Sequence, residues 1–201
     1  MTRYQALKVL ASTMKDEICI VSLGGIVDEW FDARPHPREA SLYLMALGCH
    51  MPLAFGVAVG LPHRTVVCLE TDGSVLMNLG ILATLGNEQP QNLKIFVFDN
   101  EIYECIGGPP THTSGRVDLA AMARGAGISE ARTVRAEGEL REAAAEAFKT
   151  EGLQFVVAKI QPGVEEGLPR KKYDGIEDKY RFVRYLEDTE GTVILPPSQH
   201  N

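Results

Sequence analysis

The apolar residues of the chain gather in four short continuous runs, at residues 18–23, 65–69, 93–98 and 155–160. Continuous runs, rather than alternating apolar and polar positions, are typical of strands that are buried on both faces of a parallel sheet. Glycine, aspartate or asparagine follows closely after each of the first three runs and indicates a turn there. We therefore predict four buried strands.

Between these runs, apolar side chains recur at the spacing of an amphipathic helix, as Tyr4, Leu7, Leu10 and Met14 show near the start of the chain. The sequence predicts further helices at residues 53–61, 75–85, 119–123, 139–149 and 177–186. Strands that alternate with helices predict an α/β fold, with a doubly wound, mostly parallel sheet and helices on both faces. We expect one domain over residues 1–190 and a C-terminal tail over residues 191–201.

Composition and charge narrow the class of protein. The 201 residues are 45% hydrophobic and 23% charged, which is close to average globular usage and excludes a disordered or fibrous chain. A formal net charge of −7 argues against non-specific binding of nucleic acid. No apolar stretch reaches the ~18 residues of a membrane helix, and the first residues show no signal-peptide pattern. We therefore expect a cytoplasmic protein that is not bound to a membrane.

Four cysteines are scattered along the chain without a CxxC pair, at Cys19, Cys49, Cys68 and Cys105. Three of the four lie among apolar residues. This usage is typical of a reduced protein whose thiols are free and buried.

The turns after the first three predicted strands carry the candidate chemistry. In parallel sheets, ligands bind beyond the carboxyl ends of the strands. Gly24, Gly25 and Gly73 lie in these turns, where glycines let the backbone approach a phosphate. Asp72 and Asn100 offer hard oxygen ligands, which suit a magnesium ion that also binds a diphosphate. The sequence therefore predicts a metal–diphosphate site.

A longer pattern makes the prediction specific. Asp72-Gly73-Ser74 is followed by Asp99-Asn100, with 25 residues between Gly73 and Asp99. This resembles the motif of thiamine diphosphate enzymes, which reads Gly-Asp-Gly, a similar interval, and Asn-Asn. The segments TDGSVLMNLGILATL and FDNEIYECIGGPPTHT are similar to those of sulfopyruvate decarboxylase beta subunits and phosphonopyruvate decarboxylases. The resemblance covers roughly the whole of the predicted domain and implies a thiamine diphosphate-binding fold.

The resemblance implies roles for the residues of the motif. Asp72 and Asn100 would bind Mg²⁺ through their side chains, and Ile102 would bind it through its backbone carbonyl. Gly73 and Ser74 would hold the diphosphate. The family's first motif glycine is absent here, because a threonine precedes Asp72; this crowds the turn but leaves the ligands.

A second segment matches the family less closely. Met45, Ala46 and Leu47 lie where the family has a Gly-Ser-Met stretch. By resemblance, Met45 would offer a backbone carbonyl to the aminopyrimidine ring, and Leu47 would be the bulky wedge that bends the cofactor into its reactive shape. Gly24 and Tyr103 complete the cofactor-binding set that we expect. Leu47 has the alternative role of a simple core residue.

The chain is long enough for only one of the two similar domains that thiamine diphosphate enzymes pair. The resemblance therefore implies a hetero-oligomer in which a separate aminopyrimidine-binding alpha subunit supplies the catalytic glutamate. It implies a magnesium-dependent decarboxylase, a lyase that acts on an anionic 2-oxo acid. The alternatives are a carboligase subunit similar to acetolactate synthase, a non-catalytic nucleotide-binding α/β module, and a regulatory subunit without turnover.

Several polar residues have roles that the sequence leaves open. His112 is a candidate catalytic residue, as a substrate contact or a proton donor, or else a structural residue. His50 is either part of the active loop or a structural histidine. Glu104 either transfers protons or bonds to a neighbouring backbone. We interpret the basic residues of the loop at residues 32–38 as solvated rather than substrate-binding.

Overall fold

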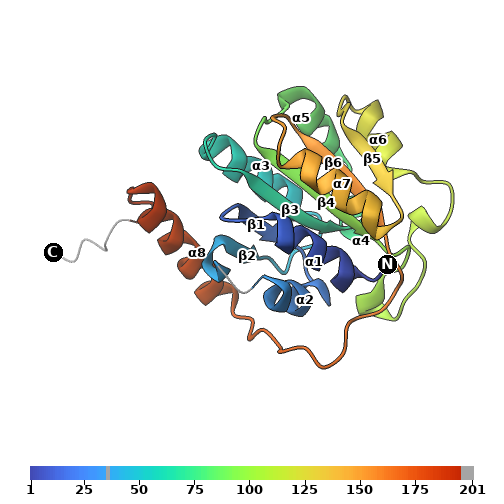
Figure 1. Ribbon diagram of the computed structural model, residues 1–201, viewed down its shortest axis with the longest axis horizontal. Coiled ribbons are helices and arrows are strands. Elements are labelled where there is room, and N and C mark those ends of the chain that lie inside the picture. Colours follow the sequence, from blue (N-terminus) through green and yellow to red (C-terminus); the bar gives the residue numbers. More distant parts are fainter. Residues whose placement is uncertain (35–36, 196–201) are drawn as a thin grey trace.

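A six-stranded sheet forms the centre of the computed structural model, which describes residues 1–34 and 37–195 (Figure 1). The strands are β1 (Ile18–Val21), β2 (Ser41–Tyr43), β3 (Val66–Thr71), β4 (Leu93–Asp99), β5 (Ala131–Val134) and β6 (Gln154–Lys159). Their order is β2-β1-β3-β4-β6-β5, and all neighbouring strands are parallel. The doubly wound α/β fold is therefore confirmed.

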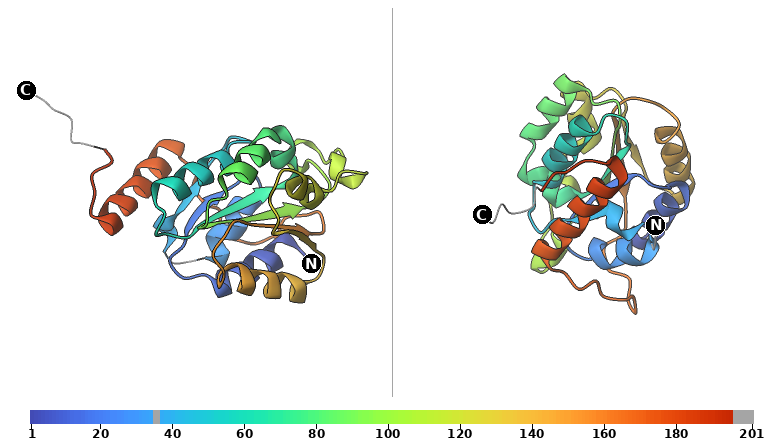
Figure 2. Two further views of the ribbon diagram at one scale, coloured as in Figure 1. Left: turned by 90° about the horizontal axis from the view of Figure 1, so that it is seen from above. Right: turned by 90° about the vertical axis from the view of Figure 1, so that its left-hand side faces the viewer.

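Helices cover both faces of the sheet (Figure 2). They are α1 (Arg3–Thr13), α2 (Ile26–Ala33), α3 (His50–Gly60), α4 (Asp72–Met77), α5 (Gly80–Glu88), α6 (Leu119–Gly125), α7 (Glu137–Ala147) and α8 (Gly175–Glu190). Short 3₁₀ turns occur at Arg38–Ala40, Glu104–Ile106 and His112–Ser114. The predicted helix at residues 75–85 is two helices, α4 and α5, with a break between them.

The sheet separates two hydrophobic cores, because successive side chains of a strand point to opposite faces. Ile18 and Ile20 of β1 pack in one core with α3, α5 and α6. Cys19 and Val21 pack in the other with α1, α2 and α7. Helix α8 contributes Phe182 to the first core, lies against β2, and projects from the body of the molecule (Figures 1 and 2).

The strands that the apolar runs did not predict are β2 and β5, the two edges of the sheet. β2 has three residues, and of the two middle residues of β5 one is partly buried and the other is exposed. An edge strand is paired on one side only, so it needs no continuous apolar run. Helix α2 was not predicted either, although a short amphipathic helix forms directly after the first glycine turn.

Two of the four cysteines, Cys19 and Cys68, are buried, whereas Cys49 and Cys105 are exposed. The expectation of buried thiols is therefore correct for two of them only. Among the residues that the structure describes, no helix combines the length and the apolar character needed to cross a bilayer. Of the predicted tail, residues 196–201 lie outside the described residues.

Candidate functional site

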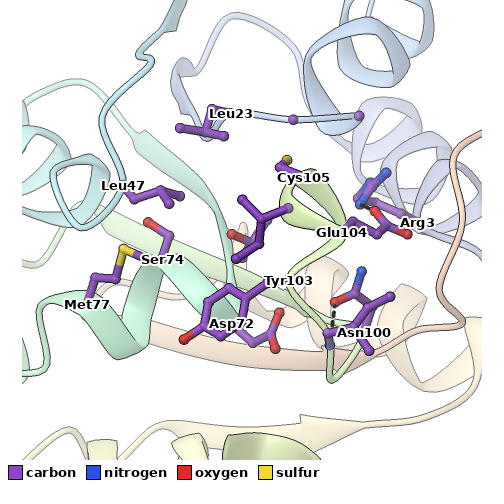
Figure 3. Close-up of a pocket in the computed structure, with 16 residues that line it drawn as sticks. Arg3, Leu23, Leu47, Asp72, Ser74, Met77, Asn100, Tyr103, Glu104 and Cys105 are labelled. Atoms are coloured by element: carbon purple, nitrogen blue, oxygen red, sulfur yellow. Dashed lines mark hydrogen bonds and ion pairs between the residues drawn. The ribbon is translucent and has the colours of Figure 1, made fainter. Parts of the chain in front are cut away.

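A pocket of about 100 Å³ lies at the carboxyl ends of β1, β3 and β4 (Figure 3). Residues from six segments line it: the N-terminal helix, the loops after β1, β2 and β4, the end of β3, and α4. The pocket brings together most of the predicted site residues, which are Gly24, Leu47, Asp72, Gly73, Ser74, Asn100, Ile102 and Tyr103. The strand-end position expected from the sequence is therefore where the pocket lies.

Asp72 is the first residue of α4 and directly follows β3. Its side chain is buried, and its Oδ2 accepts a hydrogen bond from the Thr111 hydroxyl at 2.7 Å and lies 3.2 Å from the Thr113 hydroxyl oxygen. Burial raises the pKa of Asp72 to about 6; the Thr111 hydroxyl opposes this shift and the charge of Asp99 adds to it. A cation beside this carboxylate would favour its ionised form.

Asn100 follows β4 and is nearly buried. Its Oδ1 accepts a hydrogen bond from the Ile102 backbone N–H at 3.2 Å, which folds the loop tightly around it. Between the two, Glu101 has a φ of 66°, a left-handed conformation that is strained for a residue other than glycine. Such strain is common in segments that hold a ligand.

The Thr113 hydroxyl joins the ends of β3 and β4, because it donates to Asp99 Oδ1 at 2.7 Å and also contacts the Asp72 carboxylate. Lys159 of the next strand lies 2.8 Å from Asp99 Oδ2 and neutralises that carboxylate. Among the described residues, no group of three or more His, Cys, Asp or Glu side chains could hold a metal ion. Asp72 and Asn100 together offer one carboxylate and one amide oxygen, the small protein share that magnesium usually takes beside water and phosphate.

Two glycines at the pocket let a neighbouring side chain approach the backbone closely. A Cβ on Gly73 would lie 2.6 Å from Cε1 of Tyr103, so the tyrosine ring rests directly on the turn. A Cβ on Gly24 would lie 2.9 Å from the Sγ of Cys105. The pocket that Tyr103 and Cys105 border is also lined by Asp72 and Asn100. The carboxylate and amide oxygens of this pair fit a magnesium-bound diphosphate.

Ser74 is fully buried, and its hydroxyl already has partners within the protein. Its Oγ accepts a hydrogen bond from the Gly48 N–H at 2.9 Å and lies 3.2 Å from His50 Nδ1. A contact from Ser74 to a diphosphate would therefore come from its backbone. His50, whose role the sequence left open, is buried among these partners.

Residues 44–49 form the wedge loop, which connects β2 to α3. Leu47 lines the pocket with 36% of its side chain exposed, as expected of a residue that meets a ligand rather than the core. Met45 is 43% exposed and, like Ala46, does not line the pocket. The contacts that we predict for these residues with a cofactor stay predictions.

Arg3 is a pocket residue that the sequence patterns did not indicate. It is 3% exposed, and its Nε lies 2.7 Å from Glu29 Oε2 while its Nη1 lies 3.0 Å from Glu104 Oε2. Burial lowers the pKa of Arg3, but hydrogen bonds and charges of the two carboxylates outweigh burial and leave it raised. One signal was present: Arg3 lies four residues before Leu7, on the apolar stripe of its helix.

Glu104 contacts both a charged side chain and a backbone N–H group. Besides Arg3, it accepts a hydrogen bond from the Gly163 N–H, in the connection between β6 and α8. Of the two roles open in the sequence, bonding to a backbone is the one that this contact supports. The carboxylate holds the loop after β4 against the start of the chain (Figure 3).

Two basic residues lie away from the positions that the sequence suggested. His112 is exposed and does not line the pocket, so its catalytic role stays a prediction. Arg34 is 4% exposed and donates hydrogen bonds to the backbone oxygens of Lys15 and Glu17. The interpretation of Arg34 as solvated was wrong, because its guanidinium is buried against these carbonyls. His36 lies outside the described residues.

The sequence profile of the thiamine pyrophosphate enzyme, C-terminal TPP binding domain matches residues 29–158, more than half of the chain. The chain belongs to this family. Among its relatives, sulfopyruvate decarboxylase subunit beta of Methanococcus maripaludis is 30% identical over 188 residues, covering 93% of this chain and 98% of that subunit. Phosphonopyruvate decarboxylase of Streptomyces viridochromogenes is 36% identical over 97% of this TPP-binding chain. The match spans only 49% of that longer protein.

Solved structures give the same fold. Benzoylformate decarboxylase from Polynucleobacter necessarius superimposes with a TM-score of 0.70 and 24% sequence identity, over 82% of this chain and 34% of that one. The TPP-binding domain thus has the architecture of thiamine diphosphate enzymes. Both relatives above are named decarboxylases, so the family predicted from the sequence motifs is confirmed.

Proposed function

We propose that this chain is the diphosphate- and magnesium-binding subunit of a thiamine diphosphate-dependent 2-oxo acid decarboxylase. One observation carries the proposal: Asp72 and Asn100 follow adjacent parallel strands and line one pocket together with Gly73. In a chain of this family, that arrangement provides oxygen ligands for a metal that holds a diphosphate.

We call the part of the pocket formed by Asp72, Gly73, Ser74, Asn100 and Ile102 the metal half, and each of these residues has a separate role. Asp72 contributes the negative charge, and Asn100 and the backbone carbonyl of Ile102 contribute neutral oxygens. Gly73 and the Ser74 N–H contact the diphosphate at the start of α4. The Thr111 hydroxyl holds Asp72 Oδ2, at 2.7 Å, so the carboxylate keeps a fixed direction.

The other half of the pocket receives the thiamine rings. Met45 offers its backbone carbonyl, Leu47 is the wedge, and Gly24 and Tyr103 border the space between them. Thiamine diphosphate, when bound, supplies the carbanion and the electron sink for loss of carbon dioxide from a 2-oxo acid. The chain's own part is to bind, bend and shield the cofactor from water.

The relatives support the choice of partner and substrate. The sulfopyruvate decarboxylase relative is named a subunit beta and matches this chain along 98% of its own length. This supports a separate alpha subunit that binds the aminopyrimidine and supplies a glutamate. The names of the relatives support a 2-oxo acid with a second anionic group, a sulfonate or a phosphonate. Exposed Met45, Leu47, Met77 and Ile106 near the pocket favour a covering partner.

Carboligation is the second candidate activity. A probable acetolactate synthase of Oryza sativa is 32% identical over 155 residues, although this chain spans only 23% of it. The two reactions share the cofactor and the loss of carbon dioxide, and they differ in the product that is then released: an aldehyde or an acyloin. Product analysis separates them.

The test has two stages. Calorimetry of the full chain with thiamine diphosphate should detect binding that requires Mg²⁺ and disappears with EDTA. Co-expression with a partner from a neighbouring reading frame should then give release of carbon dioxide from sulfopyruvate or phosphonopyruvate, with the aldehyde as product. Absence of magnesium-dependent binding would contradict the proposal, and so would full turnover by the chain alone.

A further inference from the structure

A buried histidine lies beneath the wedge loop and contacts the elements on both sides of it. His50 opens α3 and has no exposed surface. Its Nε2 donates a hydrogen bond to the Leu44 carbonyl at 2.7 Å. On the opposite side of the ring, Nδ1 lies 3.2 Å from Glu70 Oε2 and 3.2 Å from Ser74 Oγ. One ring therefore joins the start of the wedge loop to the end of β3 and to α4.

The far end of the wedge loop is fixed in the same way. The Gly48 N–H donates to Ser74 Oγ at 2.9 Å, and the Gly48 carbonyl accepts from Asn78 Nδ2 at 2.8 Å. Gly48 also has a φ of 77°, and a Cβ there would lie 3.1 Å from the Asn78 Cβ. The loop is thus held at Leu44 and at Gly48.

Between these two fixed points lie Met45 and Leu47, to which the proposed function gives contacts with the thiamine rings. Leu47 lines the pocket, and neither it nor Met45 is buried in the core. The position of Leu47 is therefore set by the ends of the loop rather than by packing around its own side chain. At the Leu44 end, His50 holds the Leu44 carbonyl, while the Leu44 N–H donates to Val21 O of β1 at 3.2 Å.

The charge of Glu70 gives the ring a fixed orientation. Glu70 is fully buried, and its Oε1 accepts a hydrogen bond from the Thr71 N–H at 3.0 Å. Its other oxygen faces His50 Nδ1. A buried carboxylate needs a charged or donating partner, so it keeps Nδ1 turned toward β3 and Nε2 toward the loop.

We propose that His50 is a positioning residue. It holds the wedge loop so that Leu47 and Met45 meet the thiamine rings, and it has no part in binding the diphosphate. This inference rests on the proposed function. It goes beyond a structural histidine, because it predicts that removing the ring harms one half of the cofactor site and spares the other.

Two ligands separate the halves: inorganic pyrophosphate with Mg²⁺ tests the metal half, and thiamine diphosphate with Mg²⁺ tests both. In calorimetry with the full chain, His50→Asn should lower affinity for thiamine diphosphate about tenfold. This is the effect expected from losing one hydrogen bond, the one from the His50 ring to the Leu44 carbonyl. Affinity for magnesium pyrophosphate should change less than about twofold. His50→Gln should restore part of the loss, because its amide reaches the Leu44 carbonyl.

The matched control is His63→Gln, at an exposed histidine that pairs with Glu190 far from the pocket. It should leave both affinities unchanged. In the complex with the partner, His50→Asn should lower kcat more than it raises the KM of the 2-oxo acid.

The outcomes are distinguishable. If the wild-type chain binds neither probe, the proposed function fails. If the wild type binds both and His50→Asn weakens both equally, or weakens neither, the positioning role is overturned while the proposed function stands. Loss of folding in both His50 variants would make His50 purely structural and would also overturn the inference.

Discussion

Two loops meet at the pocket and are held in different ways. The metal loop, residues 100–111, largely folds on itself: the Tyr103 N–H donates to Pro109 O at 2.9 Å, and the Thr111 N–H donates to Glu101 O at 2.9 Å. An antiparallel bridge joins Ile102 to Pro110. The wedge loop has one such internal backbone bond, from the Cys49 N–H to Ala46 O at 3.2 Å. Its other fixed points lie outside the loop: the Leu44 N–H donates to Val21 O of β1 at 3.2 Å, and the remaining partners are side chains of α3, α4 and the break after α4.

This difference means that the metal half of the site is preformed, whereas the thiamine half depends on neighbouring elements for its position. The metal loop carries its ligand geometry in its own hydrogen bonds, so it should bind a magnesium diphosphate in the isolated chain. The wedge loop places Leu47 at the pocket and relies on neighbours for its position. A partner subunit should therefore alter the thiamine half more than the metal half.

Asp72→Ala should have the largest effect, because it removes the one carboxylate that we assign to the metal. Binding of both magnesium pyrophosphate and thiamine diphosphate should fall by at least about 100-fold, while the circular dichroism spectrum stays that of the wild type. Calorimetry measures both affinities, and Asp188→Ala, at an exposed position on α8, is the control. Unchanged affinity would show that the metal lies elsewhere.

Arg3→Ala should reduce the free energy of unfolding by about 3–5 kcal/mol, because it leaves the buried Glu29 carboxylate without its cation. It also releases Glu104 and with it one anchor of the metal loop. Urea denaturation measures the stability. Arg141→Ala, in an exposed pair with Glu137, should cost less than about 1 kcal/mol. A similar loss of unfolding free energy in the two variants would mean that the buried ion pairs of Arg3 stabilise the fold no more than an exposed pair does.

Leu47→Ala should lower turnover about 100-fold, since misplacement of a reacting group by ~1 Å has that effect, with little change in stability. The side chain is 36% exposed, so a cavity in the core is not expected. Steady-state kinetics of the complex and calorimetry of the cofactor give the two quantities. Equal losses in turnover and affinity would assign Leu47 to ground-state binding alone.

The smallest effect should appear as a pH dependence of stability at His50. Burial lowers the pKa of this ring, but the hydrogen bond and charge of Glu70 outweigh burial and raise it above its ordinary value. A raised pKa contributes stability below the unfolded pKa, near 6.5, that is lost as the pH rises through the folded value. The difference in unfolding free energy between the wild type and His50→Gln should therefore shrink from pH 6 toward higher pH. A constant difference would mean that the pKa of the ring is the same in the folded and unfolded states.

The sequence predicted the metal half better than the thiamine half. Asp72 and Asn100 directly follow buried strands, so the topology of a parallel sheet alone brings them together. Arg3 could not be found in this way, because its carboxylate partners are 26 and 101 residues away in the chain. The hydroxyl of Ser74 and the ring of His50 likewise act through tertiary contacts that no local pattern reports.

The order of strands also has a consequence for synthesis of the chain. Strand β5 pairs only with β6, which comes later in the chain and lies between β4 and β5. As the ribosome releases the chain, β5 is without a sheet partner until residues 154–159 have been added. At about 5–20 residues per second, this interval lasts roughly one to five seconds. The apolar side chains of Ala131 and Val134 are then open to other nascent chains or to a chaperone.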